Sequence, residues 1–416
     1  MNHARTTPRF AAALARLEGR IDWEQRARGN GSMKVDLDPI RRLSRRLGSP
    51  ETRFRAVHVA GTKGKGSTAA LVAAAARACG VATGLYTSPH VEHWNERILL
   101  GGVPVAPDLF AAGLERTLDV ADEHATWFDC LTAAAFWVFA HEGVELAVVE
   151  AGLGGRLDST NALPAGVAAV TNIDLEHTEV LGSTREAIAF EKASIAKPGG
   201  VLVSGIGPAD DPAQVVAERV ARDNGARFVD AWAGSRATLD VRNLTLARAI
   251  LGECAQHDPR LEPSALDDPA LRAAARLPAR FERFVYRGVP VVLDGAHVAS
   301  SVRAVLDEAG LDGTLVGSPT VLFGARPDKA IEALLGEFVG RSRVVIAPRW
   351  DVRTAAPEEI AARAADLGLN AIATDDAARA LGLAASLAGA GWILVTGSLH
   401  FAGALRPLLR ERADRP

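Results

Sequence analysis

Cysteine is scarce in this chain, whose 416 residues include only Cys79, Cys130 and Cys254. The three lie far apart, are odd in number and show none of the paired spacings typical of disulfide frameworks or zinc sites. Neither kind of cross-link is therefore predicted, and we expect these cysteines to be small core residues.

The chain also lacks long apolar runs and an excess of charge of either sign. No window reaches about 18 apolar residues without a charge, and the first 25 residues contain no apolar core of a signal peptide, so neither a membrane span nor a secretion signal is predicted. The 47 Lys and Arg against 50 Asp and Glu give a formal net charge of −3, which offers no field for nucleic acid. We expect a cytoplasmic protein.

What the sequence does contain is a repeated alternation of short apolar runs and helical patterns, which is typical of βα units and a largely parallel sheet. The length predicts two domains, each with its own core. Two series of strands are expected, at 56–60, 84–88, 145–150, 167–172 and 201–205, and at 289–296, 320–325, 343–348, 370–375 and 392–397. Between them, residues 262–281 lose β character and include three prolines. We therefore predict an α/β domain at 1–276 and a second, smaller one at 277–416.

A glycine- and lysine-rich turn, GTKGKGS at 61–67, leaves the first strand and enters an alanine-rich helix. Such a turn points backbone N–H groups at a phosphate, and the helix N-terminus adds partial positive charge. A strict P-loop pattern would need glycine at Val59 and Ser or Thr at Gly66. The alternative is a tight turn with a helix N-cap at Ser67 or Thr68 and two solvated lysines. The strand, turn and helix context favours a triphosphate site.

Further polar residues follow other strands, at the carboxyl ends where such sheets bind ligands. Glu150 ends an apolar strand and is followed by a glycine-rich loop with Arg156 and Asp158. A buried carboxylate needs a partner, and at a nucleotide site a bound cation is the usual one. A dinucleotide fingerprint is disfavoured because a polar turn, not a helix, follows the glycines. Ser88, just past another strand, is a weaker candidate.

A polar loop and a helix follow the strand at 167–172. His177 lies in the loop between two acids, and Lys192 lies on a helix that begins at an N-cap Ser or Thr, flanked by apolar residues. Taken singly, the histidine is expected to be solvated and the lysine to be a surface residue. Like Glu150, both residues follow a strand of the first series, and this shared position favours a common site.

Five motifs, taken in order, resemble the folylpolyglutamate synthase and dihydrofolate synthase family, ATP-dependent amide ligases related to the Mur ligases. The motifs are the turn at 61–67, TSPH (87–90), EAGLGGRLDSTN (150–161), LEHTEVLGSTREAIAFEKASI (175–195) and LDGAH (293–297). The resemblance runs from about residue 12 to 410. It implies an N-terminal P-loop ATPase-type three-layer domain, a smaller C-terminal Rossmann-like domain, and an active site in the cleft between them.

The resemblance also implies roles for individual residues. ATP would be held by Gly61, Thr62, Gly64, Lys65, Gly66, Ser67, Asn243, Arg280, Asp294 and His297. Two Mg²⁺ ions would be held by Ser67, Ser88, Glu150 and His177, and a monovalent cation remains an open alternative. The catalytic residues would be Lys65, Lys192 as a carbamate, His177 and His297. The pterin-bearing substrate would be contacted by Thr126, Phe128, Arg156 and Asp158.

The chain departs from the family pattern in a few places. Val298 stands where asparagine is usual, and Ala279 and Ser194 stand where glycine is usual; none of these removes an expected ligand. The segment 206–243 is a few tens of residues short, so the adenine contact of Asn243 is the least secure transfer.

The expected activity is addition of L-glutamate to dihydropteroate and to the glutamate tail of reduced folates through an acyl phosphate, by a monomer. A synthase that acts on folates alone and a non-catalytic nucleotide-binding relative are the alternatives. A ligase for UDP-sugar peptides is disfavoured, because only 60 residues precede Gly61 where a separate UDP-binding domain would be needed.

Overall fold

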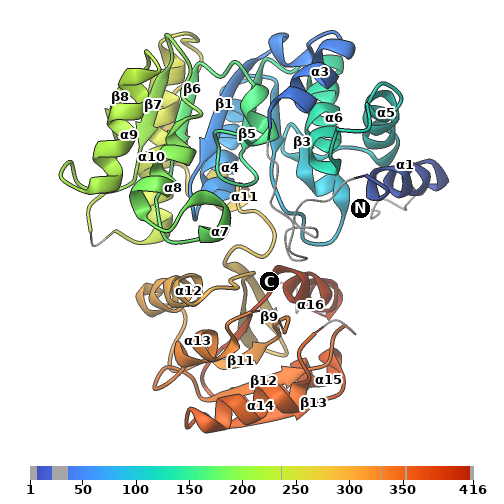
Figure 1. Ribbon diagram of the computed structural model, residues 1–416. Helices are drawn as coiled ribbons and strands as arrows, with labels where there is room; N and C mark the ends of the chain where they lie inside the picture. Colours follow the sequence, from blue (N-terminus) through green and yellow to red (C-terminus); the bar gives the residue numbers. More distant parts are fainter. Residues whose placement is uncertain (1–6, 21–35, 236, 328, 352–353, 413–416) are drawn as a thin grey trace. The chain divides into compact units, whose positions relative to one another are not determined.

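The computed structural model describes residues 7–20, 36–235, 237–327, 329–351 and 354–412. The chain divides into two compact units, residues 1–276 and 277–416 (Figure 1). Among the described residues, none of the helices has both the length and the hydropathy that a bilayer-spanning segment needs.

The first unit is built on an eight-stranded sheet in the order β4-β3-β2-β5-β1-β6-β7-β8. Its strands are β1 (Arg55–Ala60), β2 (Thr83–Tyr86), β3 (Ile98–Leu100), β4 (Val103–Pro104), β5 (Leu146–Glu150), β6 (Val167–Val170), β7 (Val201–Ser204) and β8 (Arg227–Asp230). The pairs from β2 to β8 are parallel, and β3 and β4 are added antiparallel. Parallel strands buried on both faces explain the continuous apolar runs.

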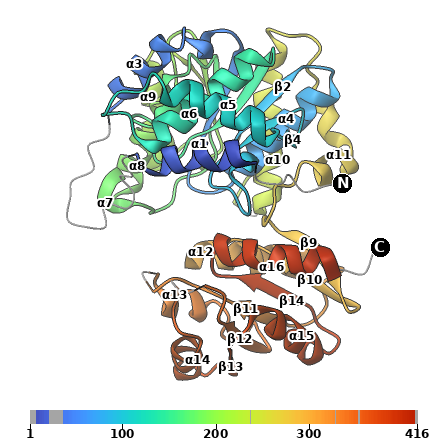
Figure 2. The same ribbon diagram turned by 90° about the vertical axis from the view of Figure 1, so that its right-hand side faces the viewer.

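Helices cover both faces of this sheet (Figure 1). They are α1 (Pro8–Glu18), α3 (Asp38–Arg46), α4 (Lys65–Ala78), α5 (Pro107–Leu118), α6 (Trp127–His141), α7 (Thr178–Leu181), α8 (Arg185–Ala193), α9 (Pro212–Asp223), α10 (Leu239–Ala255) and α11 (Pro269–Ala274), with 3-10 turns at Pro50–Thr52, Trp94–Arg97, Ser159–Ala162 and Pro263–Asp267. The helices α4 and α10 pack on each other and on the central strands. One apolar cluster joins α1, α3, α5 and α6 to the sheet, and another joins α8 and α9 to it; Figure 2 shows α1, α5 and α6 side by side.

The second unit has a six-stranded sheet in the order β13-β12-β11-β14-β10-β9. Its strands are β9 (Glu282–Tyr286), β10 (Val289–Leu293), β11 (Thr320–Phe323), β12 (Val344–Pro348), β13 (Ala371–Thr374) and β14 (Ile393–Thr396), and its helices are α12 (Ala299–Leu311), α13 (Ile331–Gly336), α14 (Pro357–Asp366), α15 (Ala377–Leu387) and α16 (Leu399–Arg412). All pairs are parallel except β9 with β10. The α/β class with mostly parallel sheets is thus confirmed.

The ten expected strands are all present, most of them shorter by one or two residues. The sequence missed β3, β4, β8 and β9, which are short or lie at the sheet edges and carry alternating or exposed side chains, as in the burial of β8. An edge strand is covered on fewer sides and does not need a continuous apolar run. The cysteine expectation holds for Cys130 and Cys254, which are buried and free, whereas Cys79 is partly exposed.

Candidate active site

The glycine-rich turn joins the end of β1 to the start of α4, in a backbone conformation that requires glycine. Gly61 has φ 142° and Gly64 has φ 80°. A Cβ on Gly61 would lie 1.9 Å from Thr171 Oγ1, and one on Gly64 would lie 2.2 Å from Asn243 Oδ1. The two glycines therefore combine left-handed backbone with close packing, as a phosphate-binding turn needs.

The end of β6 holds this turn in place. Thr171 Oγ1 and Asn172 Nδ2 both donate to the Lys63 carbonyl, at 2.6 and 2.8 Å, and Asn172 Oδ1 accepts from Lys63 N at 3.0 Å. The sequence analysis missed this clamp, although the change from apolar to polar residues at the end of β6 was a usable signal. The clamp fixes the turn from a strand more than a hundred residues away.

The two lysines of the turn differ in their surroundings. Lys63 Nζ pairs with Asp174 at 3.2 Å, whereas Lys65 Nζ donates to the Thr62 carbonyl at 3.3 Å and has no acidic partner among the residues that the structure describes. The helix α4 begins at Lys65, with Gly64 as N-cap. An N-cap at Ser67 or Thr68 was wrong, because the turn is tighter than that alternative required and both residues lie inside the first helical turn.

Glu150 lies beside the turn. It ends β5 next to β1, paired in register with Val59, so it is adjacent to the strand that leads into Gly61. Its side chain is 5% exposed, and Oε2 accepts from Ser88 N at 3.0 Å. The structure therefore brings two predicted metal ligands, Glu150 and Ser88, together at the carboxyl ends of neighbouring strands.

Lys192 also reaches the turn. Its side chain is 3% exposed, and Nζ donates to the Gly61 carbonyl at 2.7 Å. Burial, together with the nearby charge of Lys65, lowers the pKa of Lys192 to about 7. The amine is consequently about half neutral at neutral pH, which is the form that reacts with CO₂.

His177 lies further out. It is the N-cap of α7, with φ 51° and its side chain 48% exposed, and its ring nitrogens lie 3.7 Å from Glu176 and 3.8 Å from Glu179. Within the described ranges, no three His, Cys, Asp or Glu side chains come together as a metal site. The expected set of two hydroxyls, one carboxylate and one imidazole fits Mg²⁺ rather than a structural metal, because Mg²⁺ keeps waters and phosphate oxygens as ligands.

The expected substrate contacts lie on the loop after β5 and at the start of α6. Thr126 is the N-cap of α6 in a capping box with Asp129. Phe128 packs over Gly152, where a Cβ would lie 2.6 Å from its ring and 3.0 Å from Asp158. Arg156 donates to Glu191 at 2.9 Å. The structure thus brings Phe128 and Asp158 together, while Thr126 caps its own helix and Arg156 pairs with Glu191 of α8.

An aromatic cluster borders Phe128, and the sequence analysis did not find it. The Trp127 ring lies 5.5 Å from Phe128 and 5.9 Å from Trp94. The buried Arg97 guanidinium lies over both tryptophans and donates to His90 Nδ1 at 2.9 Å. Trp94 and the consecutive rings of Trp127 and Phe128 come from separate segments, so no local pattern indicates the contact between Trp94 and Trp127.

A buried polar chain runs beneath the same loop. Asp158 accepts from Thr160 N at 3.0 Å and from the Thr160 hydroxyl, and burial raises the pKa of the Asp158 carboxyl. Thr160 Oγ1 lies 2.8 Å from Nε2 of His58, which is fully buried in β1. Because the single hydroxyl proton goes to Asp158, Nε2 of His58 is the donor. Nδ1 has no partner among the described residues, so the ring is neutral.

In the second unit the three expected nucleotide ligands lie where β9 begins and its partner β10 ends. Asp294 is buried and accepts from Phe281 N and Ala296 N, both at 2.8 Å; burial raises the pKa of its carboxyl, opposed by the charge of Arg280. His297 Nδ1 lies 3.1 Å from the Gly295 carbonyl. Two loops at one sheet edge thus carry Arg280, Asp294 and His297.

Two known families cover most of the chain. Residues 59–245 match the Mur ligase middle domain, and residues 279–399 match the Mur ligase glutamate ligase domain. The folylpolyglutamate synthase of Lacticaseibacillus casei is 31% identical over 87% of this chain and 92% of the relative. The chain belongs to the folylpolyglutamate synthase family of Mur ligases.

Two further comparisons indicate the same family. A probable bifunctional folylpolyglutamate synthase/dihydropteroate synthase of Haloferax volcanii is 34% identical over 88% of this chain, which spans 48% of that relative's length. The structure of E. coli FolC in complex with DHPP and ADP superposes with a TM-score of 0.80 and 25% identity, covering 99% of this chain and 100% of the other.

The departures of this Mur ligase from the family pattern have visible structural settings. Ala279 is buried with φ 50°, a conformation that favours glycine, and its carbonyl accepts from Gly295 N at 3.0 Å. Asn243 lies on α10, 3% exposed, and accepts from Thr68 Oγ1 at 3.3 Å. The helix α10 therefore packs against the phosphate turn through Asn243 and stabilises it.

The close packing of Gly61 leads to a prediction for this Mur ligase. Gly61→Ala should lower the free energy of unfolding by about 3 kcal/mol, because the new methyl group would overlap Thr171 in a conformation that L residues avoid. Chemical denaturation measures this. Gly80→Ala is the matched control, since Gly80 also has positive φ but nothing lies within 4 Å of its Cβ position; equal losses in the two variants would refute the packing argument.

Proposed function

We propose that this chain is an ATP-dependent ligase that joins L-glutamate by an amide bond to dihydropteroate and to the glutamate tail of reduced folates. The observation that carries the proposal is the meeting of three expected site elements at one turn: Lys65 at the start of α4, Glu150 beside β1, and Lys192 bonded to Gly61. The relatives' names, which include folylpolyglutamate synthase, support a folate and glutamate as substrates, and the resemblance of Thr126, Phe128 and Asp158 to pterin-contacting residues supports dihydropteroate.

The reaction needs an activated carboxylate, because a carboxylate carbon is electron-rich and oxide is a poor leaving group. A substrate carboxylate oxygen attacks the γ-phosphorus of ATP, the bond to ADP breaks, and an acyl phosphate forms. The amine of L-glutamate then attacks the acyl carbon, phosphate leaves and the amine loses a proton. Lys65 and the N-terminus of α4 would stabilise the charge that develops on the phosphoryl oxygens.

Magnesium, when bound, would neutralise phosphate charge and hold the reacting oxygens in line. We assign Ser67, Ser88, Glu150 and His177 as its ligands, for two ions. The setting of Glu150 supports this assignment, since a carboxylate that is 5% exposed beside a phosphate turn is stabilised by a cation.

Lys192 is proposed to act as a carbamate that orients the second metal. The half-neutral amine supports this: the nitrogen of the neutral amine attacks CO₂, an N–C bond forms and one proton is released, so that a neutral amine becomes an anionic carbamate. Starting from the ammonium, two protons are released in all, and a cation becomes an anion. For the second unit, we assign nucleotide contacts to Arg280, Asp294 and His297, and for adenine to Asn243. We further propose a cytoplasmic monomer.

A coupled assay of ADP release tests the activity. Dihydropteroate and tetrahydrofolate are offered separately, each with and without L-glutamate, in the presence of Mg²⁺ and ATP. We expect ADP release with both acceptors only when glutamate is present. Release with tetrahydrofolate alone would establish the monofunctional synthase, and no release with either acceptor would refute ligase activity in favour of a non-catalytic relative.

A further inference from the structure

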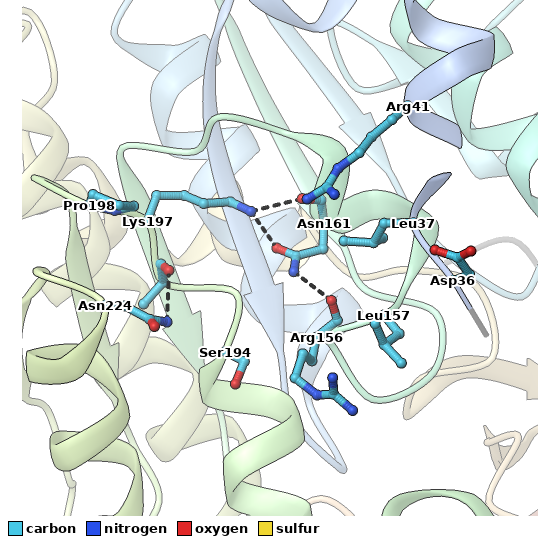
Figure 3. A pocket seen from close by; sticks show the side chains of 11 residues that line it. Asp36, Leu37, Arg41, Arg156, Leu157, Asn161, Ser194, Lys197, Pro198 and Asn224 are labelled. Atoms are coloured by element: carbon cyan, nitrogen blue, oxygen red, sulfur yellow. Dashed lines mark hydrogen bonds between the residues drawn. The ribbon is translucent and has the colours of Figure 1, made fainter. Parts of the chain in front are cut away.

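A cavity of about 430 Å³ lies in the first unit, away from the residues assigned to ATP (Figure 3). Its lining is polar and comes from α3, the loop after β5 and the segments that follow α8 and α9. The polar residues that matter are Arg41, Arg156, Asn161, Ser194, Lys197 and Asn224. The volume fits a small molecule rather than a protein segment.

The cavity lies toward the amino ends of the parallel strands, and the phosphate turn lies at their carboxyl ends. Lys197 and Asn224 lie in the segments that enter β7 and β8, and Asn161 precedes β6. These are the amino ends of parallel strands, whereas Gly61 follows the carboxyl end of β1. A ligand held by these residues is therefore distinct from the ATP phosphates.

Two cations of the cavity have no acidic partner among the described residues. Lys197 Nζ donates to the carbonyl and the side-chain oxygen of Asn161, at 2.8 and 2.7 Å, and both acceptors are neutral. Burial, with the nearby charge of Arg41, lowers the pKa of Lys197 to about 8. Figure 3 shows Arg41 and Lys197 extending from different sides of the cavity toward Asn161. Two cations thus face one space.

The remaining charges do not neutralise them. Arg156 is already engaged by Glu191, at 2.9 Å. Among the lining residues that the structure describes, the one acid is Asp36, which accepts from the backbone N–H of Asp38 at 2.9 Å. The hydrogen bonds to Asn161 give Lys197 a structural role, because they connect two loops. They do not explain Arg41, which lies exposed on α3 and points into the same cavity.

We propose that this cavity binds a small oxyanion, a carboxylate or a phosphate, through the ammonium of Lys197 and the guanidinium of Arg41. A guanidinium suits planar oxyanions, and an ammonium in the same cavity adds a point charge in a partly desolvated site. Asn224 lines the same space with an amide. The occupant would join α3 to the segment that follows α8, and so stabilise the folded state by mass action.

Inorganic phosphate and succinate distinguish the two sources of oxyanion. Each is titrated calorimetrically into the full chain with excess ADP and Mg²⁺, so that the phosphate turn is filled. We expect saturable binding of at least one of them, weakened about tenfold or more in Arg41→Ala, the loss of one charge-assisted interaction. Binding of phosphate alone assigns a phosphate group, and binding of succinate alone assigns carboxylates.

The matched control is Arg45→Ala, since Arg45 lies on the same helix, is exposed and does not line the cavity. Its affinity should equal that of the unaltered chain, and both variants should unfold at the same temperature in the absence of anions. Two results would overturn the proposal. One is equal affinity in Arg41→Ala and Arg45→Ala, and the other is no saturable binding of either anion up to about 10 mM, since a Kd above that value corresponds to a binding free energy weaker than about 3 kcal/mol.

Discussion

Replacing Lys65 with alanine is expected to reduce glutamate-dependent ADP release on the order of 10³-fold, with the fold intact. Lys65 starts α4 and lacks an acidic partner among the described residues, so its charge is available to the transferring phosphoryl group, where one lost donor costs two to three orders of magnitude. Steady-state kinetics with both acceptors measures the loss, and thermal unfolding verifies that the variant is folded.

Lys63→Ala is the matched control for this prediction. Lys63 lies two residues away in the same turn, but its ammonium is paired with Asp174 at 3.2 Å. We expect its rate loss to be at least about tenfold smaller than that of Lys65→Ala, since the charge of Lys63 is already neutralised by Asp174. A Lys65→Ala enzyme with near-normal turnover would refute the assignment of the turn to the ATP phosphates.

The second large effect is acid sensitivity that originates at His58. Burial, with a smaller contribution from the charge of Lys197, lowers the pKa of His58 to about 3. In the unfolded chain the ring titrates near 6.5, so the unfolded state binds the proton first and stability falls as the pH drops from about 6.5 toward 3. The loss is about 2 kcal/mol at pH 5 and about 4 kcal/mol over the whole window.

Denaturant unfolding of the full chain at pH 7 and pH 5 measures this effect. His58→Gln keeps an N–H donor for Thr160 but does not titrate, so the stability difference between the two pH values should shrink by about 2 kcal/mol. His124→Gln is the control, because the His124 side chain is 68% exposed. An unchanged difference in His58→Gln would show that the acid sensitivity has another origin.

Much of the fold was predictable from the sequence because its information is local. Strands such as β1 and β5 are buried on both faces and therefore read as continuous apolar runs. Edge strands such as β8 escape that signal, because their partly exposed faces carry charged residues. The glycine-rich turn between β1 and α4 was predictable for a similar reason: glycine spacing between a strand and a helix is contained within a few residues.

For the candidate site, the sequence predicted which residues follow the ends of strands, but not the contacts that those residues make. Glu150 follows a strand, and parallel strands end at a common edge, so its place beside Gly61 could be expected. The polar residues at the end of β6 indicated a ligand or a contact there, but not that Asn172 would bond to Lys63, because neither segment specifies a partner 109 residues away. The ion pair of Arg156 with Glu191 could not be predicted either, because only the packing of the chain determines which of several acids lies beside Arg156.

The sequence by itself determined the class of fold, the family and the order of the chemistry-bearing segments, because periodicity, turn composition and ordered motifs are local properties. The tertiary structure alone decided which polar groups are desolvated and which cations have no acidic partner in the part of the chain that the structure describes. His58, Lys192 and the pair of Lys197 with Arg41 owe their properties to burial and to distant neighbours, which depend on how the chain folds back on itself.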